Sequence, residues 1–172
     1  MQLAVISDTH LDVPDDLLVF AFEEYLQSAD ILIHCGDFTG EEVYAYLNYH
    51  PNFLAVRGNC DYFRGSADLP VNLSMNIGGR KVCAAHGWGR RHEVGENVAR
   101  SFGPGPDLVL YGHTHERFAG SASTGALLVN PGALFKPKSG APSIALIEMS
   151  IEPRVQFVDL SCKPAGSGSC EN

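Results

Sequence analysis

Short apolar segments alternate with amphipathic ones through the first third of the chain. Three apolar runs of strand length are bounded by polar turn residues, at Gln2–Ile6, Asp30–His34 and Phe53–Val56. Between them, apolar side chains recur at helical spacing from Leu18 to Leu26 and over Glu41–Tyr49. We expect the first helix to have Pro14 in its first turn and Asp12 as its cap. This alternation is typical of a mostly parallel sheet covered by helices.

Strands dominate the pattern after residue 70. Gly78-Gly79 separates two apolar segments, Val71–Ile77 and Arg80–Ala84, which predicts a β-hairpin. One more helix is expected over Glu93–Phe102, ended by the Gly-Pro-Gly-Pro run at 103–106. Four further short strands are predicted at Asp107–Tyr111, 127–129, 144–148 and 155–158. This half of the chain therefore predicts a second sheet, packed on the first.

The length of 172 residues and the apolar content of 45% are ordinary for one globular domain. We expect this domain to span residues 1–162. Residues 163–172 are mostly small or polar, with little to bury, and are expected to form a mobile tail. The first ten residues lack the basic region of a signal peptide, and no apolar run approaches the roughly 20 residues that span a bilayer. We therefore expect a soluble, cytoplasmic protein with no membrane partner.

The formal charge narrows the range of partners. Lys and Arg total 12 against 20 Asp and Glu, which gives −8. This excess argues against a stable nucleic-acid partner, although a local metal or arginine can still attract a small phosphate. The five cysteines form no Cys-x-x-Cys pair, so a thiolate zinc site is unsupported. Cys35 and Cys83 lie in apolar strands and are expected in the core, whereas His50 is expected on the surface at a helix end.

Side chains suited to metal binding occur just past the ends of the predicted strands. They are Asp8 and His10 after the first strand, Asp37 after the second, Asn59 after the third, His86 after the hairpin, and His113 and His115 after the next strand. Strand ends gather at one edge of an open α/β sheet, so these side chains are expected to converge. Each signal is weak alone, because Asp8 could simply form a turn and the last two histidines could be solvated loop residues.

Glycine beside three of these residues sharpens the signal. It precedes Asp37, Asn59 and His113 in the chain. Glycine is favoured where the backbone must approach another group closely or adopt a positive φ. The combination, in this order, favours one composite site over a set of unrelated turns.

The order of motifs resembles the calcineurin-like metallophosphoesterase superfamily, in particular its small bacterial and archaeal phosphodiesterase branch. The matching motifs are Asp8-Thr9-His10, Gly36-Asp37, Gly58-Asn59-Cys60-Asp61, His86-Gly87, Gly112-His113-Thr114-His115 and Asn130-Pro131-Gly132. The resemblance extends over about residues 1–160. It implies an α/β fold, a four-layer α-β-β-α sandwich of two mixed sheets flanked by helices, with a dinuclear metal site at one sheet edge.

The resemblance also implies a set of ligands for each of two divalent cations. One cation would be held by Asp8, His10 and His115, and the other by Asn59, His86 and His113. Asp37 would bridge them. Oxygen and imidazole ligands without thiolate suit manganese, which we favour, or nickel, iron, zinc or cobalt.

The implied reaction is hydrolysis of a small phosphodiester by a metal-activated hydroxide. Asp37, Asn59 and His86 are then the expected catalytic residues. The sequence contains neither Gly-x-Ser-x-Gly nor a complete P-loop, which agrees with a reaction that needs no protein nucleophile.

Two positions depart from the pattern of the family. Many members have a histidine after Gly-Asn that assists the leaving group, but this chain has Cys60. A thiol is a poor substitute for an imidazolium acid, so substrates with good leaving groups are expected. Trp88 stands where relatives often have a second histidine, and we interpret it as a wall of the pocket. His34 either orients Asp37 or is a satisfied buried histidine.

Two other functions stay open at this point. The same site could serve a phosphomonoesterase or nucleotidase, and the fold could serve as a non-catalytic protein-binding scaffold, as in a eukaryotic trafficking subunit that resembles this branch. A scaffold predicts decayed ligands and a large exposed apolar patch, whereas all seven ligand positions are filled here. Basic residues near the motif loops could contact phosphate or simply be solvated: Arg64, Arg90, Arg91, His92 and Arg117. A homo-oligomer is a further possible assembly.

Overall fold

The computed structural model describes residues 1–160, which form two five-stranded sheets. The first sheet has the order β10 (Arg154–Asp159), β9 (Ser143–Glu148), β1 (Gln2–Ile6), β2 (Ile31–His34), β3 (Phe53–Ala55). The second has the order β4 (Asn72–Ile77), β5 (Arg80–Ala85), β6 (Leu108–Leu110), β8 (Leu127–Asn130), β7 (Phe118–Ser121). Both sheets are mixed, as expected. The expected domain end at 162 and the tail at 163–172 lie outside the described residues.

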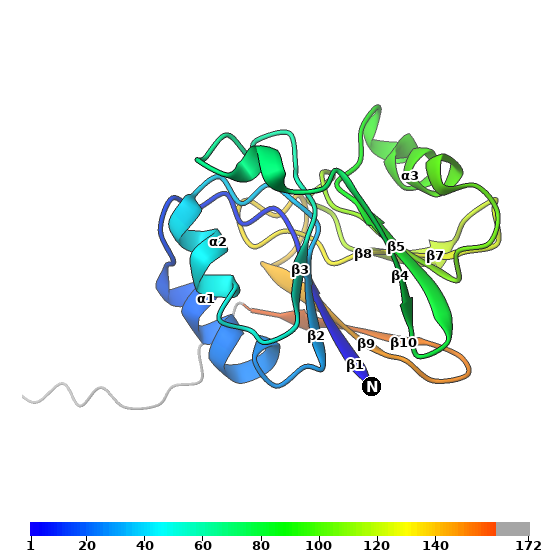
Figure 1. The fold of residues 1–172 in the computed structure, drawn as a ribbon, viewed down its shortest axis with the longest axis horizontal. Helices are drawn as coiled ribbons and strands as arrows, with labels where there is room; N and C mark the ends of the chain where they lie inside the picture. Colours follow the sequence, from blue (N-terminus) through cyan, green and yellow to red (C-terminus); the bar gives the residue numbers. More distant parts are fainter. Residues whose placement is uncertain (161–172) are drawn as a thin grey trace, which may run out of the picture.

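The helices cover the outer face of each sheet (Figure 1). The α-helix α1 (Asp16–Ala21), the π-helix η1 (Phe22–Leu26) and α2 (Glu41–Leu47) lie on the first sheet. The second is covered by α3 (Val94–Phe102), which follows a short 3₁₀ helix, η3 (Arg91–Glu93). Another 3₁₀ helix, η2 (Ser66–Asp68), lies between β3 and β4. The predicted four layers, α-β-β-α, are therefore confirmed.

The first helix begins later than predicted. Asp15 is its cap, because its carboxylate accepts a hydrogen bond of 2.8 Å from the backbone N–H of Leu18. Asp12 lies too far ahead of the helix to reach that N–H, and Pro14 precedes the cap. The cap position requires a side chain that reaches the third residue of the helix, which Asp15 supplies.

Strand β1 lies at the centre of the first sheet and is buried from Leu3 to Ile6. Leu3 and Val5 face the apolar layer between the sheets, whereas Ala4 and Ile6 face the helices. β1 pairs in parallel with β2 on one side and antiparallel with β9 on the other. The expectation that the later strands belong to the second sheet is therefore wrong for β9 and β10. A strand buried on both faces needs partners along both edges, and β9 supplies the second one.

Burial and strand pairing decide three further local predictions. Gly78 and Gly79 join β4 to β5 with φ of +59° and +79°, which confirms the hairpin. Cys35 and Cys83 are fully buried, as predicted. His50 is also buried, so its placement on the surface was wrong. Its Nε2 lies 3.0 Å from the carbonyl oxygen of Ala29, which gives this polar ring an internal partner.

Among residues 1–160, no helix is long and apolar enough to cross a membrane.

Candidate metal centre

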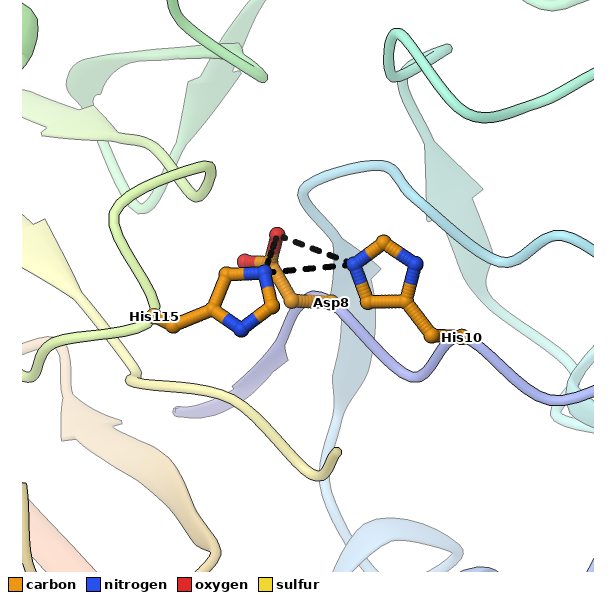
Figure 2. Close-up of side chains that lie close together, drawn as sticks. All are labelled: Asp8, His10 and His115. Carbon is orange, nitrogen blue, oxygen red and sulfur yellow. Dashed lines mark hydrogen bonds and ion pairs between the residues drawn. The ribbon is translucent and has the colours of Figure 1, made fainter. Parts of the chain in front are cut away.

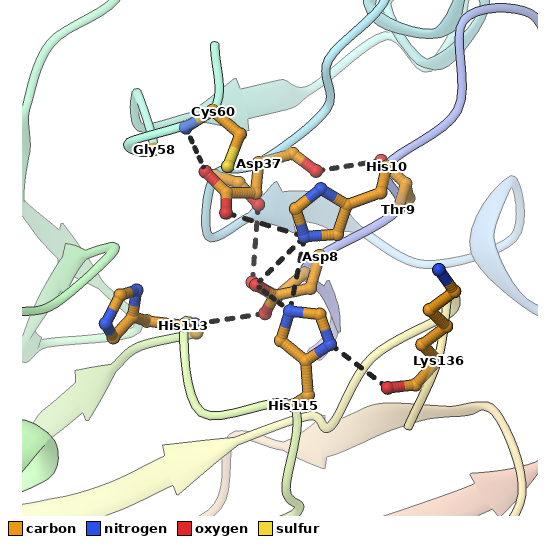
Figure 3. Close-up of polar contacts among 12 residues, drawn as sticks. Asp8, Thr9, His10, Asp37, Gly58, Cys60, His113, His115 and Lys136 are labelled. Atoms are coloured by element: carbon orange, nitrogen blue, oxygen red, sulfur yellow. Dashed lines mark hydrogen bonds and ion pairs between the residues drawn. The ribbon is translucent and has the colours of Figure 1, made fainter. Parts of the chain in front are cut away.

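The strand register brings the predicted ligands to one edge of the molecule. Ile6 of β1 pairs with His34 of β2, and His34 pairs with Ala55 of β3, so these three parallel strands end level with one another. In the second sheet, Ala84 of β5 is level with Leu110 of β6. The loops that follow these strands carry all seven predicted ligands, and Figure 3 shows several of them meeting in one place.

Asp8, His10 and His115 form one group of possible metal ligands (Figure 2). His115 Nε2 lies 3.3 Å from Asp8 Oδ1 and 3.2 Å from His10 Nε2. His10 Nε2 lies 3.9 Å from Asp8 Oδ1. Ligand atoms about 2.1 Å from one cation are about 3.0–3.4 Å apart when they are neighbours in its coordination shell. Two of the three separations fall in this range, so the group fits a divalent cation.

Asp37 connects this group to a second one. Its Oδ2 lies 3.5 Å from His10 Nε2 and 3.3 Å from His86 Nε2. The rings of His86 and His113 are 5.1 Å apart between centroids. His113 Nδ1 lies 2.9 Å from Asn59 Oδ1. The structure therefore brings all seven predicted ligands together, with Asp37 in contact with histidines from both groups.

Two buried polar atoms in this centre have no hydrogen bond to any residue between 1 and 160. They are Asp8 Oδ1 and His86 Nε2. Each has a neighbour of the opposite potential charge at 3.3 Å, His115 Nε2 for the first and Asp37 Oδ2 for the second. Buried polar groups without a partner are rare and costly, by about 1–3 kcal/mol each. A divalent cation at each of the two groups would satisfy these atoms, because a carboxylate oxygen and an imidazole nitrogen are suitable ligands.

Backbone carbonyl groups orient two of the histidines. His86 Nδ1 donates to the carbonyl oxygen of Cys35 at 2.7 Å, and His115 Nδ1 donates to that of Lys136 at 3.1 Å. A proton on Nδ1 leaves the Nε2 lone pair free in the neutral ring. In both residues Nε2 is the atom that points into the centre.

Burial and the nearby carboxylates shift the histidine pKa values in opposite directions. Burial favours a lower pKa for His86, but Asp37 and Asp8 outweigh it and raise the pKa. Contact with Asp8 raises the pKa of His115, whereas burial lowers the pKa of His10. Burial also favours a higher pKa for Asp37, but contact with His86 outweighs it and lowers the pKa. The centre thus holds a carboxylate whose negative charge is retained at low pH.

The backbone is strained at the ligands themselves. Positive φ angles in residues other than glycine occur, within the described part of the chain, at Asp8, His10, Asp37, Thr39, His113, His115 and Lys136. Five of these are predicted ligands, and the other two lie beside the centre in the chain or in space. Such conformations cost about 1–3 kcal/mol each and persist where the surrounding structure holds them. Function, rather than stability, accounts best for this concentration of strain.

Asp61 organises two of the ligand loops, a role that the motif comparison did not assign. Its carboxylate is buried and accepts four backbone N–H groups, from Asp37, Phe38, Thr39 and Gly58, at 2.6–3.1 Å. The sequence contains one signal for this role, because an aspartate in a turn, here two residues after Asn59, commonly accepts hydrogen bonds from nearby backbone N–H groups. Its long-range partners are 22–24 residues away and could not be identified from spacing.

His34 is fully buried and both of its ring nitrogens have partners, which confirms the expectation of a satisfied buried histidine. In the described part of the chain its hydrogen bonds go to Gly36 and Thr9 and not to Asp37. Its Nδ1 accepts a hydrogen bond of 3.0 Å from the N–H of Gly36, so the neutral ring carries its proton on Nε2. Nε2 lies 3.2 Å from Thr9 Oγ1. His34 also stacks on Phe38, with 3.6 Å between ring centroids. It thereby links the loop after β1 to the loop after β2.

Cys60 borders the centre. Its N–H donates to Asp37 Oδ1 at 2.8 Å, and its Sγ lies within 4.8 Å of ligand atoms of Asp37 and His10. Burial and the charge of Asp37 raise the pKa of its thiol to about 11. The thiol is therefore neutral near pH 7 and a weak acid.

The basic residues near the motif loops lie apart from this group of ligands. Arg117 forms an ion pair with Asp159, and His92 lies 3.6 Å from Glu93. Arg64 and Arg90 are exposed. Arg91, with His92 and Arg117, lines a different cavity between α3 and the strands β7 and β8. Of the residues singled out from sequence, Trp88 is the one that shares a cavity with Asn59 and His86.

The family follows from comparison with known domains. A model described as the calcineurin-like phosphoesterase superfamily domain matches residues 1–152. The chain belongs to this superfamily. It is 32% identical over 159 residues to a probable metallophosphoesterase of Methanocaldococcus jannaschii, an alignment that covers 91% of this chain and 79% of the relative. A phosphodiesterase of the same organism is 28% identical over 161 residues, covering 86% and 93%.

Three solved structures share the fold of this chain. An archaeal phosphodiesterase, 26% identical, covers 92% of this chain and 100% of its own, with a TM-score of 0.68. The phosphoesterase YfcE of E. coli is 21% identical, with a TM-score of 0.67 and 94% coverage of each chain. Vps29 of Entamoeba histolytica is 22% identical, with a TM-score of 0.65, and covers 94% and 100%. The family, the fold and the class of enzyme predicted from the motifs, a hydrolase of phosphoric esters, are confirmed.

Proposed function

We propose that the protein hydrolyses phosphodiesters at a site for two divalent cations. The observation that carries the proposal is the position of Asp37, whose Oδ2 contacts His10 on one side and His86 on the other. A shared carboxylate is the ligand that two cations about 3.5–4 Å apart require. Asp8, His10 and His115 would hold one cation, and Asn59, His86 and His113 the other.

Bound divalent cations lower the pKa of water toward neutrality and offset the charge that develops on phosphoryl oxygens. The residues of this chain supply the geometry. The carbonyl groups behind His86 and His115 hold the rings, and Asp61 holds the loop that carries Asp37. Because these positions are fixed before substrate arrives, little reorganisation is needed during the reaction.

A metal-reconstitution assay tests the proposal. Protein treated with a chelator should regain hydrolysis of bis(p-nitrophenyl) phosphate when manganese is added, and nickel, zinc, iron, cobalt and magnesium should be compared. Two metal ions per chain are expected by elemental analysis. Asp37→Asn should reduce the rate by at least 100-fold, whereas Asp68→Asn, at an exposed position on η2, should not. A stoichiometry of one ion, or hydrolysis that needs none, would contradict the dinuclear proposal.

The assay also separates the alternatives. A phosphomonoesterase would hydrolyse p-nitrophenyl phosphate faster than the matched diester. A scaffold would show no metal-dependent hydrolysis of either ester. We expect the diester to be the better substrate, because the 28% identical archaeal relative is a phosphodiesterase.

A further inference from the structure

A small cavity adjoins one half of the metal centre. It has a volume of about 290 Å³ and is lined by residues of three segments: Arg57, Gly58 and Asn59; Val71 and Asn72; and Ala85, His86, Gly87 and Trp88. Asn59 and His86 are two of the proposed ligands, so any group that fills the cavity lies next to the reacting phosphate. The volume is at the lower end of small-molecule sites and suits a single ring system.

Trp88 forms one wall of this cavity and is exposed, although it is a large aromatic residue. Its side chain is 48% exposed, and its indole N–H forms no hydrogen bond within the described part of the chain. Large aromatic side chains are normally buried, and tryptophan usually finds a hydrogen-bond partner when it is. An exposed indole face beside a cation site is suited to stack on a planar ring of a ligand.

The loop that carries Trp88 is held in place. Gly87 has φ of +107°, and a Cβ there would meet Val94 Cγ1 at 2.5 Å, so only glycine fits against α3. The carbonyl oxygen of Trp88 accepts a hydrogen bond of 3.2 Å from Asn97 Nδ2, also on α3. The wall is therefore positioned before any ligand binds, which lowers the entropic cost of binding.

Arg57 places a positive charge in the same cavity. Its backbone N–H is bonded to the carbonyl oxygen of Pro70 at 2.8 Å. Its guanidinium forms no ion pair with any carboxylate of residues 1–160, although the whole chain carries a charge of −8. An unpaired guanidinium favours a phosphate or another anion. Asn72 adds an amide group, which can both donate and accept hydrogen bonds.

We propose that this cavity binds the nucleoside part of a phosphodiester substrate, with the base stacked on Trp88 and the phosphate directed toward Arg57 and the metal ligands. The proposal rests on the proposed function, since it names the substrate class of the same site. A planar base fits the ring-sized volume, the exposed indole face and the amide of Asn72. A simple alkyl ester would use none of these features.

The chain contains a single tryptophan, so its fluorescence reports on this cavity alone. Metal-free protein should be titrated with thymidine 5′-monophosphate, with excitation at a wavelength that the base does not absorb. We expect saturable quenching by the nucleotide and none by methyl phosphate. Arg57→Gln should weaken nucleotide binding at least fivefold. This measurement needs no catalysis, so it stands apart from the outcome of the metal-reconstitution assay.

Three results of the titration would overturn the proposal. The first is the absence of quenching, and the second is linear quenching equal to that of free N-acetyltryptophanamide, which indicates random collisions. Quenching by methyl phosphate equal to that by the nucleotide would likewise contradict it, because no base would then be needed.

A comparison of two esters tests the same cavity during turnover. Thymidine 5′-(p-nitrophenyl phosphate) and methyl p-nitrophenyl phosphate share a leaving group and differ in the nucleoside. Trp88→Ala should lower the ratio of their kcat/KM values about tenfold, which corresponds to about 1.4 kcal/mol. Phe118→Ala, at a similarly exposed aromatic on β7, is the matched control and should leave the ratio unchanged.

An unchanged ratio in Trp88→Ala would refute the proposal even if both esters are hydrolysed. Loss of hydrolysis of both esters by the native protein would instead refute the proposed function, and the fluorescence titration would still decide the nucleoside site.

Discussion

Asp61 organises two loops of the proposed metal centre without being one of its predicted ligands. Oδ1 accepts the N–H groups of Phe38 and Thr39, and Oδ2 accepts those of Asp37 and Gly58. Hydrogen bonds to an ionised acceptor are about twice as strong as neutral ones. The carboxylate thus ties the loop after β2 to the loop after β3. The positive φ of Asp37, +63°, is held in part by these bonds.

Asp61→Asn should weaken both stability and metal binding. In either orientation the amide NH₂ replaces an acceptor oxygen and leaves two buried N–H groups unpaired. At about 1–3 kcal/mol each, the free energy of unfolding should fall by about 3 kcal/mol, and manganese affinity should fall at least tenfold. Thermal unfolding and metal titration measure the two effects. Asp68→Asn, at an exposed position of η2, is the control; equal behaviour of the two variants would show that Asp61 has no such role.

Cys60→His should extend the range of substrates. The neutral thiol, with its pKa raised to about 11 by burial and Asp37, is a poor proton donor to a departing alkoxide. A histidine at this position should increase kcat on an alkyl ester with a poor leaving group by about tenfold or more. Hydrolysis of a p-nitrophenyl ester, whose leaving group needs no proton, should change little. Cys60→Ser is the control, and an equal gain on both esters would contradict this role.

That the seven candidate ligands lie together was predictable from sequence, because each follows an apolar strand and most lie beside a glycine. Their orientation was not. The carbonyl oxygens of Cys35 and Lys136 fix two rings through hydrogen bonds that span 51 and 21 residues. Every residue has a backbone carbonyl group, so residue identity does not show which carbonyl accepts a hydrogen bond, and no motif predicts such partners. His50 was misplaced for the same reason, since its partner is the carbonyl oxygen of Ala29.

At the level of elements, the loop after β3 contacts the loop after β2 at Gly58. A Cβ on Gly58 would lie 2.1 Å from Asp37 Oδ1 and 2.3 Å from the backbone nitrogen of Asp37. The backbone nitrogen of Asp37 can move only if the whole loop after β2 moves with it. The glycine is required here for close approach, in accordance with the sequence signal.

Gly58→Ala should displace the loop of Asp37. Overpacking of a tight contact typically costs about 1–3 kcal/mol, so we expect a loss in the free energy of unfolding of that size. Manganese binding, measured by calorimetry, should be lost or reduced at least tenfold. Gly120→Ala on β7 is the matched control, because its Cβ would meet the outer ring atoms of Phe118, which can rotate. Normal metal binding by Gly58→Ala would contradict the steric argument.

The sequence predicted the parallel strands well and the sheet membership of the later strands poorly. β1, β2 and β3 are successive and joined by helices, so their neighbours follow from chain order. β9 pairs with β1 across more than 130 residues, and only the burial of β1 on both faces requires it. β7 (Phe118–Ser121) escaped prediction because it is a half-exposed edge strand that contains Gly120.

At the level of the whole molecule, metal binding should be coupled to pH. The pKa values of His86 and His115 are raised by the carboxylates around them, so in the metal-free protein these rings keep their protons to higher pH. A cation must displace those protons. The increase in unfolding temperature caused by manganese should therefore be small at pH 6 and larger at pH 8.

Thermal unfolding with and without manganese at the two pH values measures this coupling. At a concentration 100 times its dissociation constant, a ligand adds about 2.7 kcal/mol to the free energy of unfolding. For a chain of this length that is about 5–11 °C. Asp37→Asn should abolish the increase at both pH values. An equal or larger increase at pH 6 in the native protein would contradict the predicted coupling.

The topology also determines when a cation can first be captured during biosynthesis. The proposed ligands extend from Asp8 to His115, and β1, the strand that precedes Asp8, is completed by pairing with β9 at Ser143–Glu148. A ribosome adds about 5–20 residues per second, so the time between the synthesis of Asp8 and that of His115 is on the order of ten seconds. During this interval the emerging chain holds only part of the coordination shell. A cation that binds at the proposed centre would therefore be selected by the folded protein, rather than by the nascent chain, from the ions available after synthesis.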